Sequence, residues 1–303
     1  MRVIKRTKGR QAYFYIQHSF RKNGKVVSRE IYVGKQLPAE LEELKNQFME
    51  ECYKEGLFKV LSRIKNRFQE EWSKYPESVK EKAMEQIAVA FTYNTNAIEG
   101  STITLEETRE LLEEAVTPNK PLRDVQESLA HAKTFSGMLH KKEALSLALI
   151  LRWHKELFSA SKPDIAGCFR EYLVRVGEYR APDWQDVEGL MKDLLKLYRK
   201  NLQMNSVELA AKMHYRFEKI HPFGDGNGRV GRLLMNYVLW WNKCPMLIIE
   251  YKKRKSYYRA LQRDEAGFVN YFIKRFIAIH KVVSKNLNRQ LKLGEQKRYN
   301  GRA

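Results

Sequence analysis

The segment from His221 to Arg232, HPFGDGNGRVGR, gathers residue types that can do chemistry on a phosphate group. Gly224, Gly226 and Gly228 allow the backbone to bend and to approach a ligand closely. The apolar run that follows, residues 233–239, predicts a helix. A glycine-bearing loop that runs into a helix N-terminus presents free backbone N–H groups to an anion. The segment therefore predicts an anion-binding site.

The charged side chains of this segment narrow the anion to a phosphate. Arg229 and Arg232 lie three residues apart and share one helix face. Two cations at a helix N-terminus oppose the helix dipole, so their placement makes sense if a multiply charged anion binds there. Asp225 can hold Mg²⁺ on phosphates, and His221 can act as a general base near neutral pH. These side chains indicate phosphoryl or nucleotidyl transfer, although the GxxxxGK[ST] pattern of a P-loop is missing.

The same segment matches the motif HxFx(D/E)GNGRxxR at every fixed position, so the chain resembles the Fic (Fido) proteins. This family moves AMP from ATP onto hydroxyl side chains of proteins. Weaker similarity extends the resemblance over about residues 90–280, in segments 154–158, 167–170, 174–177, 187–191 and 256–261. The resemblance implies a mainly α fold, a Fic-fold helical bundle with a short flap hairpin.

The resemblance also implies a role for each motif residue. His221 would take the proton from a target Ser, Thr or Tyr, and Phe223 would anchor the loop in the core. Asp225 would bind Mg²⁺, while Arg229 and Arg232 would contact the β- and γ-phosphates. The nucleotide-binding residues implied in this way are Val176, Gly177, Asp225, Gly226, Asn227, Gly228, Arg229, Arg232 and Tyr257. The chain would then be an enzyme, a Mg²⁺- and ATP-dependent protein adenylyltransferase.

A second motif lies upstream, where residues 95–100, TNAIEG, match the inhibitory pattern (S/T)xxxE(G/N) of the family. The family's inhibitory glutamate, here Glu99, pairs with the second motif arginine, here Arg232. That pairing would occupy the donors meant for the γ-phosphate and make the enzyme autoinhibited. In some relatives the same glutamate positions water for AMP removal, and the sequence does not separate the two uses. Glu265 stands where some relatives carry an Asn that contacts the base, which leaves the nucleotide preference open.

The elements that position these motifs are predicted to be helical after Pro38. Apolar spacing predicts helices over 39–73, 77–98, 124–141, 143–158, 184–202, 205–220, 227–242, 255–266 and 268–293. Another helix should start at Thr104, which is followed by Glu107 as in a capping box. Residues 172–177 favour a short β-structure. Before Pro38, two β-prone runs, 12–20 and 25–33, flank Asn23-Gly24 and predict a β-hairpin.

We therefore expect a small basic β-hairpin extension over residues 1–36 and a helical region with the inhibitory motif over 37–115. The catalytic domain should span 116–285, and a basic tail should follow over 286–303. The region 37–90 could pack within the monomer or form a homodimer. The protein partner would be a substrate with a hydroxyl side chain, and self-AMPylation is also open.

The chain of 303 residues has a net charge of +20, which is uneven along its length. Residues 1–36 contribute +9 and residues 281–303 contribute +6, so the remaining +5 belongs to residues 37–280. The basic, aromatic hairpin could bind nucleic acid, or it could be a small sheet with a solvated charged face. No apolar run reaches the roughly 18 residues of a membrane span, and the start lacks the apolar region of a secretory signal. Three scattered cysteines suggest a reducing compartment, so we expect a cytoplasmic protein without membrane contact.

Three hypotheses about function follow. The first is an autoinhibited protein adenylyltransferase. The second is a related enzyme that transfers another nucleotide or removes AMP. The third is a nucleic-acid-binding regulator whose loop only senses ATP, which the intact His221 disfavours because sensing needs no base.

Overall fold

The computed structural model describes residues 1–22 and 25–280. Backbone contacts divide the chain into two compact units, Met1–Arg63 and Ile64–Ala303, which are described separately. This division falls inside a continuous helix, whereas the sequence places domain boundaries after residues 36, 115 and 285; those boundaries stay predictions. The predicted Asn23-Gly24 turn and the predicted tail 286–303 lie outside the described residues.

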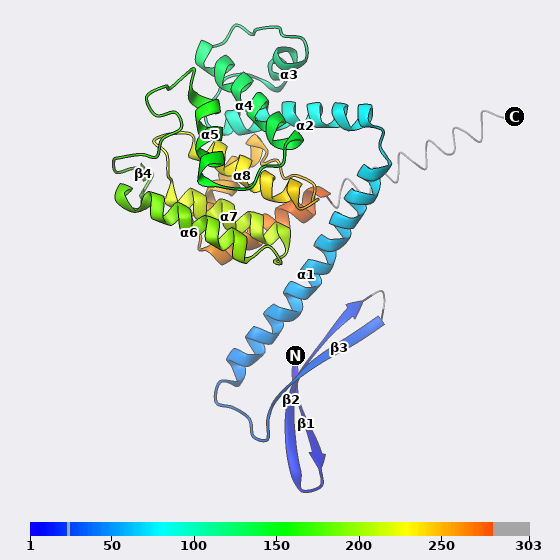
Figure 1. The fold of residues 1–303 in the computed structure, drawn as a ribbon. Helices are drawn as coiled ribbons and strands as arrows, with labels where there is room; N and C mark the ends of the chain where they lie inside the picture. The colour runs from blue at the N-terminus through cyan, green and yellow to red at the C-terminus, as the bar shows by residue number, and fades with distance from the viewer. Residues whose placement is uncertain (23–24, 281–303) are drawn as a thin grey trace, which may run out of the picture. The chain divides into compact units, whose positions relative to one another are not determined.

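The first unit begins with a three-stranded antiparallel sheet in which β2 is the central strand (Figure 1). Its strands are β1 (Arg2–Lys8), β2 (Gln11–Lys22) and β3 (Lys25–Gly34). The predicted hairpin corresponds to β2 and β3, and the sequence analysis missed β1. This edge strand reads RVIKRTK, and lysine and arginine are typical of edge strands but hide the apolar alternation. Gly9, with φ 61°, makes the tight connection to β2.

Two long helices follow, α1 (Leu41–Lys74) and α2 (Glu77–Ile98), close to their predicted bounds. Pro76 separates them and starts α2, where its missing N–H costs nothing. Glu99 is the C-cap residue of α2, so the end of this helix fixes the position of the inhibitory motif.

The next three helices are α3 (Leu105–Glu113), α4 (Leu122–His140) and α5 (Leu147–Phe158). The predicted capping box at α3 is confirmed, because the Thr104 side chain accepts from the Glu107 N–H and the Glu107 carboxylate accepts from the Thr104 N–H. Helix α5 begins later than predicted because the Ser146 hydroxyl accepts from the Leu149 N–H and caps it there.

A two-stranded flap follows α5 and is shorter than the predicted β-like run 172–177. It consists of β4 (Arg175–Val176) and β5 (Tyr179–Arg180), joined through Gly177 at φ 60°. The helical turn η1 (Trp184–Asp186) leads into α6 (Val187–Lys200), which is followed by α7 (Ser206–Ile220).

Helix α8 (Asn227–Trp241) forms the centre of the second unit, and every residue from Arg229 to Leu239 is buried. It packs most extensively against α7 and also contacts α2, α4 and α5 (Figure 1). The turn η2 (Tyr251–Lys253), α9 (Arg254–Leu261) and helical residues 265–280 complete the described part. The mainly α architecture is thus confirmed. Within residues 1–22 and 25–280, no helix is both long and apolar enough to cross a membrane.

Candidate active site

The segment from His221 to Gly226 is the loop between α7 and α8, hereafter the motif loop. It starts at His221, which ends α7 in the left-handed region at φ 50°, and it ends at Gly226, with φ 77°. A Cβ at Gly226 would overlap the Phe158 ring, so glycine is required here both by the backbone and by the packing. Asn227 holds the loop through two hydrogen bonds of 2.8 Å to the backbone N–H and carbonyl of Phe223. The loop is therefore rigidly tied to the start of α8.

Beneath the motif loop lies His154 of α5, which is fully buried. Its ring stacks on Phe223 at 3.8 Å between centroids, and Phe223 is itself buried as expected. Since its Nδ1 accepts from the Gly167 N–H at 2.9 Å, its Nε2–H donates to the Asp225 carbonyl at 3.0 Å. Burial, aided by the charge of Arg229, lowers the pKa of His154 to about 4, so the ring stays neutral. His154 positions the loop, a role that the sequence did not assign to it; a polar residue on the apolar face of α5 was the available signal.

His221 presents an imidazole suited to accept a proton. Its Nδ1 lies 3.4 Å from the Glu218 carbonyl oxygen, a long contact that favours a proton on Nδ1 and a free lone pair on Nε2. Burial, together with the charge of Arg170, lowers the pKa of His221, so the neutral base predominates at pH 7. The backbone of His221 is held by Arg170, whose Nε donates to the His221 carbonyl at 2.8 Å.

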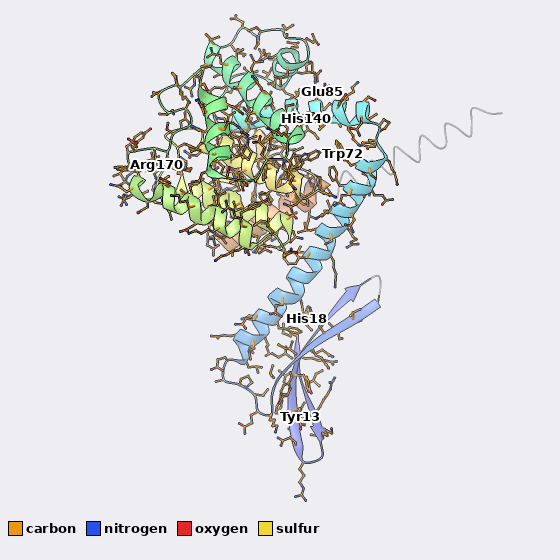
Figure 2. All side chains as sticks on the ribbon, in the orientation of Figure 1. Tyr13, His18, Trp72, Glu85, His140 and Arg170 are labelled. Carbon is orange, nitrogen blue, oxygen red and sulfur yellow. The ribbon has the colours of Figure 1, made fainter. Side chains whose placement is uncertain are left out.

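Arg170 lies in the segment between α5 and β4 and is labelled in Figure 2. This side chain is only 3% exposed, and it also donates to the carbonyls of Tyr172 and Pro182, each at 2.7 Å. One guanidinium therefore joins the motif loop to both sides of the flap.

In the structure, residues 95–100, which resemble the family's inhibitory motif, contact Arg232. Arg232 is 1% exposed, and its Nη2 donates to Glu99 Oε1 at 2.6 Å and to the Thr95 carbonyl at 3.1 Å. Its Nε donates to the Thr95 hydroxyl. Although burial opposes it, the Glu99 carboxylate raises the pKa of Arg232. Glu99 also lies against Gly228, where a Cβ would collide with its carboxylate.

The first motif arginine is also paired. Arg229 donates from Nη1 to Glu127 Oε2, and both side chains are less than 10% exposed. Glu127 accepts from Arg123 at 3.0 Å and lies 3.5 Å from the Lys162 ammonium. Burial raises the pKa of Glu127, but Arg229 and Arg123 outweigh it and hold the pKa below its usual value. The sequence analysis missed Glu127, an acid on the buried face of α4, which had to find a cation.

The Asp225 carboxylate forms an ion pair with a lysine ammonium group. Lys162 Nζ pairs with Oδ2, and Arg123 and Arg229 each lie 3.8 Å from the carboxylate. Burial raises the pKa of Asp225, but the Lys162 contact and nearby cations leave it lowered. Within the described residues no group of three or more His, Cys, Asp or Glu side chains could hold a metal ion. A single carboxylate suits Mg²⁺ that takes its other ligands from phosphates and water.

The remaining predicted contacts are more dispersed. Tyr257 is 1% exposed, and its hydroxyl forms a hydrogen bond with His214 Nε2 at 2.7 Å. The predicted contact between Tyr257 and the nucleotide stays a prediction, and the burial of this side chain does not favour it. The neighbouring Tyr258 is 42% exposed. Glu265 forms an ion pair with Arg216 at 2.6 Å. Val176 and Gly177 lie exposed on the flap.

Known proteins resemble this chain in sequence and in fold. Residues 144–239 match the model of the Fic/DOC family. The chain is 33% identical over 204 residues to protein adenylyltransferase Fic of Nematostella vectensis. The aligned region covers 65% of this chain and 48% of the relative. It is 32% identical over 209 residues to protein adenylyltransferase fic-1 of Caenorhabditis elegans, covering 66% and 41%. The matched region thus spans less than half the length of these curated relatives.

Solved structures show the same fold. Fic-1 from C. elegans superimposes with a TM-score of 0.71 at 25% identity, covering 84% of this chain and 79% of that one. A Fic-domain signaling protein from Bacteroides thetaiotaomicron gives a TM-score of 0.66 at 25% identity, covering 73% and 95%. The second unit has the Fic fold, as the resemblance implied. The chain is a Fic/DOC-domain protein, and it is homologous to the protein adenylyltransferases called Fic.

Proposed function

We propose that this protein is an adenylyltransferase that moves AMP from ATP onto a Ser, Thr or Tyr hydroxyl of a protein. The observation that carries this proposal is the arrangement of the motif loop and the first turns of α8. Together they hold a neutral histidine, a carboxylate and two buried arginines around the N-terminus of α8. Homology to protein adenylyltransferases supports the same reaction.

In the proposed reaction His221 Nε2 accepts the proton of the target hydroxyl, whose oxygen attacks the α-phosphorus of ATP. The bond from that phosphorus to the oxygen bridging to the β-phosphate breaks, and pyrophosphate leaves. The backbone N–H groups at the start of α8 and the guanidinium groups of Arg229 and Arg232 stabilise the phosphate charge. Asp225 would hold Mg²⁺, which would supply further neutralisation of the phosphates. Lys162 has to move away from Oδ2 of the Asp225 carboxylate before this oxygen can bind a metal ion.

We further propose that the described conformation is inhibited by Glu99. Its carboxylate occupies the Arg232 Nη2 donor, which in the proposed reaction would hold the γ-phosphate. A carboxylate and a phosphate oxygen compete directly for the same guanidinium edge. ATP can enter fully only if Glu99 turns away, and until then its α-phosphate is misaligned for in-line attack.

AMP removal is the second candidate, and one observation favours it. Glu99 uses Oε1 for Arg232, while its side chain is 26% exposed beside the motif loop. A partly solvated carboxylate at this point could orient a water molecule toward an AMP-modified side chain. If AMP removal is the main role of Glu99, the substitution Glu99→Gln should abolish AMP removal. If inhibition is its main role, the same substitution should raise AMP transfer. Preference for another nucleotide, self-modification and homodimer formation stay predictions.

The proposal is tested by incubating the purified chain with α-³²P-labelled ATP and Mg²⁺, both alone and with a cell extract as a source of targets. We expect weak labelling by the wild type, strong labelling by Glu99→Gly and none by His221→Ala. A suitable control is Glu106→Gln, which removes a carboxylate from an exposed ion pair on α3. Label transfer that survives in His221→Ala would refute the proposed base. Competition of the label by unlabelled UTP, GTP or CTP better than by ATP would redirect the nucleotide assignment.

A further inference from the structure

The three-stranded sheet of the first unit has two unlike faces. Side chains that pair across antiparallel strands lie on the same face, so the register assigns each residue to one of them. One face carries the apolar residues Val3, Phe14, Ile16 and Ile31, and Ile16 is fully buried. The same face also carries Lys5, Thr7, His18 and Arg29, and its apolar residues contribute to the core of the unit.

The opposite face is polar, and we call it the tyrosine face. It includes Arg2, Ile4, Arg6, Lys8, Gln11, Tyr13, Tyr15, Gln17, Ser19, Val26, Ser28, Glu30 and Tyr32. Printed side-chain contacts agree with this register: Arg2 donates to Gln17 at 2.8 Å, and the hydroxyls of Ser19 and Ser28 lie 2.7 Å apart. Figure 2 labels Tyr13 on the sheet.

Three tyrosines form the centre of this face. The rings of Tyr13 and Tyr15 lie 6.2 Å and 5.4 Å from the ring of Tyr32, which is 52% exposed. The Arg6 guanidinium lies 4.8 Å over the Tyr15 ring and also forms a bidentate ion pair with Glu30, at 2.7 and 2.9 Å. An exposed sheet face with three large aromatic side chains is unusual for a surface that contacts only solvent.

The charge of residues 1–36, which contain the sheet, indicates the kind of partner. Residues 1–36 contain ten Lys or Arg and a single acidic residue, Glu30. Arg6 already neutralises Glu30, and Arg2 and Lys8 at the two ends of β1 are further cations of the tyrosine face. The surface is therefore complementary to a polyanion.

We propose that the tyrosine face binds double-stranded DNA by entering the major groove. Three strands about 4.8 Å apart span roughly 10 Å between the backbones of the edge strands. The major groove is about 12 Å wide and admits a two-stranded β-ribbon, so the backbone width of this sheet also fits it. Arg2 and Lys8 are six residues apart on β1, so roughly 20 Å of strand separates them along the groove, and they can reach two separate phosphates of the backbone beside β1. Hydroxyl, amide and guanidinium groups between them can donate to base edges and phosphates.

A single strand fits the face less well. Single-stranded nucleic acid stacks its bases on open aromatic faces. Here Arg6 covers one face of Tyr15, and Tyr13 and Tyr15 both pack against Tyr32. The inference does not depend on AMP transfer, because the residues involved lie in the first unit.

The test measures fluorescence anisotropy of a labelled 20-base-pair duplex with the full chain at several salt concentrations. The test variant is the double substitution Arg2→Glu and Lys8→Glu. The control is Lys192→Glu with Lys196→Glu, which makes the same change in charge at side chains of α6 that are 56% and 65% exposed. We expect at least a tenfold loss of affinity at 100 mM salt for the test variant, a salt slope lower by about two, and less than a threefold change for the control. His221→Ala should bind the duplex like the wild type.

Several outcomes would overturn the assignment. An equal loss in the test and control variants would mean that binding is generally electrostatic, and no loss in the test variant would place it elsewhere in the chain. Tighter binding to the matching single strand, or to a polyglutamate peptide, would exclude the major groove as the site. Circular dichroism and thermal melting check folding, and Arg2→Gln with Lys8→Gln serves if the glutamate variant does not fold; its expected loss is at least threefold.

Discussion

The ion pair between Glu99 and Arg232 gives the sharpest prediction about activity. Arg232 is 1% exposed, and in this conformation its charge is balanced by a carboxylate 2.6 Å away. Glu99→Gln keeps the shape of the side chain but removes that charge. Two consequences follow, one for the stability of the unliganded protein and one for ATP.

The stability of the free protein should fall. Removing one partner of a fully buried ion pair costs about 3–5 kcal/mol. Glu99 is 26% exposed, and water therefore screens part of the interaction, so we expect about 1–3 kcal/mol. The unpaired Arg232 then gains from any anion that can replace the carboxylate.

ATP binding and AMP transfer should rise for the same reason. A competing interaction of about 1.4 kcal/mol corresponds to a factor of ten in the binding constant. We therefore expect Glu99→Gln to bind ATP at least tenfold more tightly and to transfer label at least tenfold faster than the wild type. ATP should also restore more thermal stability to this variant than to the wild type, because the nucleotide replaces the missing charge.

The assay combines calorimetric titration with ATP, thermal melting with and without ATP, and the initial rate of label transfer at saturating ATP. The control, Glu106→Gln, should match the wild type in all three. Equal ATP affinity and equal transfer rates for wild type and Glu99→Gln would refute the competition between carboxylate and γ-phosphate. Lower transfer with tighter ATP binding would mean that Glu99 itself takes part in the reaction.

Four further predictions concern the motif loop and the ion pairs around it. His221→Ala should lower transfer by at least ~10²-fold while leaving ATP affinity within a factor of three, because the ring supplies a base and not a phosphate contact; rate and calorimetry measure the two effects. The pKa of His221 is lowered by burial, so the neutral base should persist below pH ~6.5, and the transfer rate should decline only as pH falls through this lowered pKa; a decline already above pH 7 would contradict this. Lys162→Ala frees the Asp225 carboxylate and should lower the Mg²⁺ concentration for half-maximal ATP binding several-fold, measured by calorimetry, with Lys192→Ala as the control; an unchanged or higher Mg²⁺ requirement would refute the competition. Glu127→Gln should lower the melting temperature of the free protein, because Arg229 would lose its partner inside the fold; a melting temperature equal to that of the wild type would contradict this.

The sequence alone determined the local features of this protein. The motif from His221 to Arg232 and the resemblance it carries depend on residues that are consecutive in the chain. The capping box at Thr104 and most helix bounds depend on spacings of three or four residues, which are visible without coordinates. The partners Glu99 and Arg232 were also identified, but only because the resemblance joined two segments 133 residues apart.

Tertiary structure decided which distant side chains surround these motifs. Nothing near Arg229 in the sequence indicates that Glu127 on α4 pairs with it, or that Lys162 forms an ion pair with the Asp225 carboxylate. The supporting role of His154 and the burial of Tyr257 likewise depend on how α5 and α9 pack in the second unit. The strand β1 became recognisable only once it paired with β2, because its charges mask the alternation of an edge strand. Local sequence patterns indicate which residues form each helix or strand. Long-range packing determines which side chains are buried and which charged groups pair with one another.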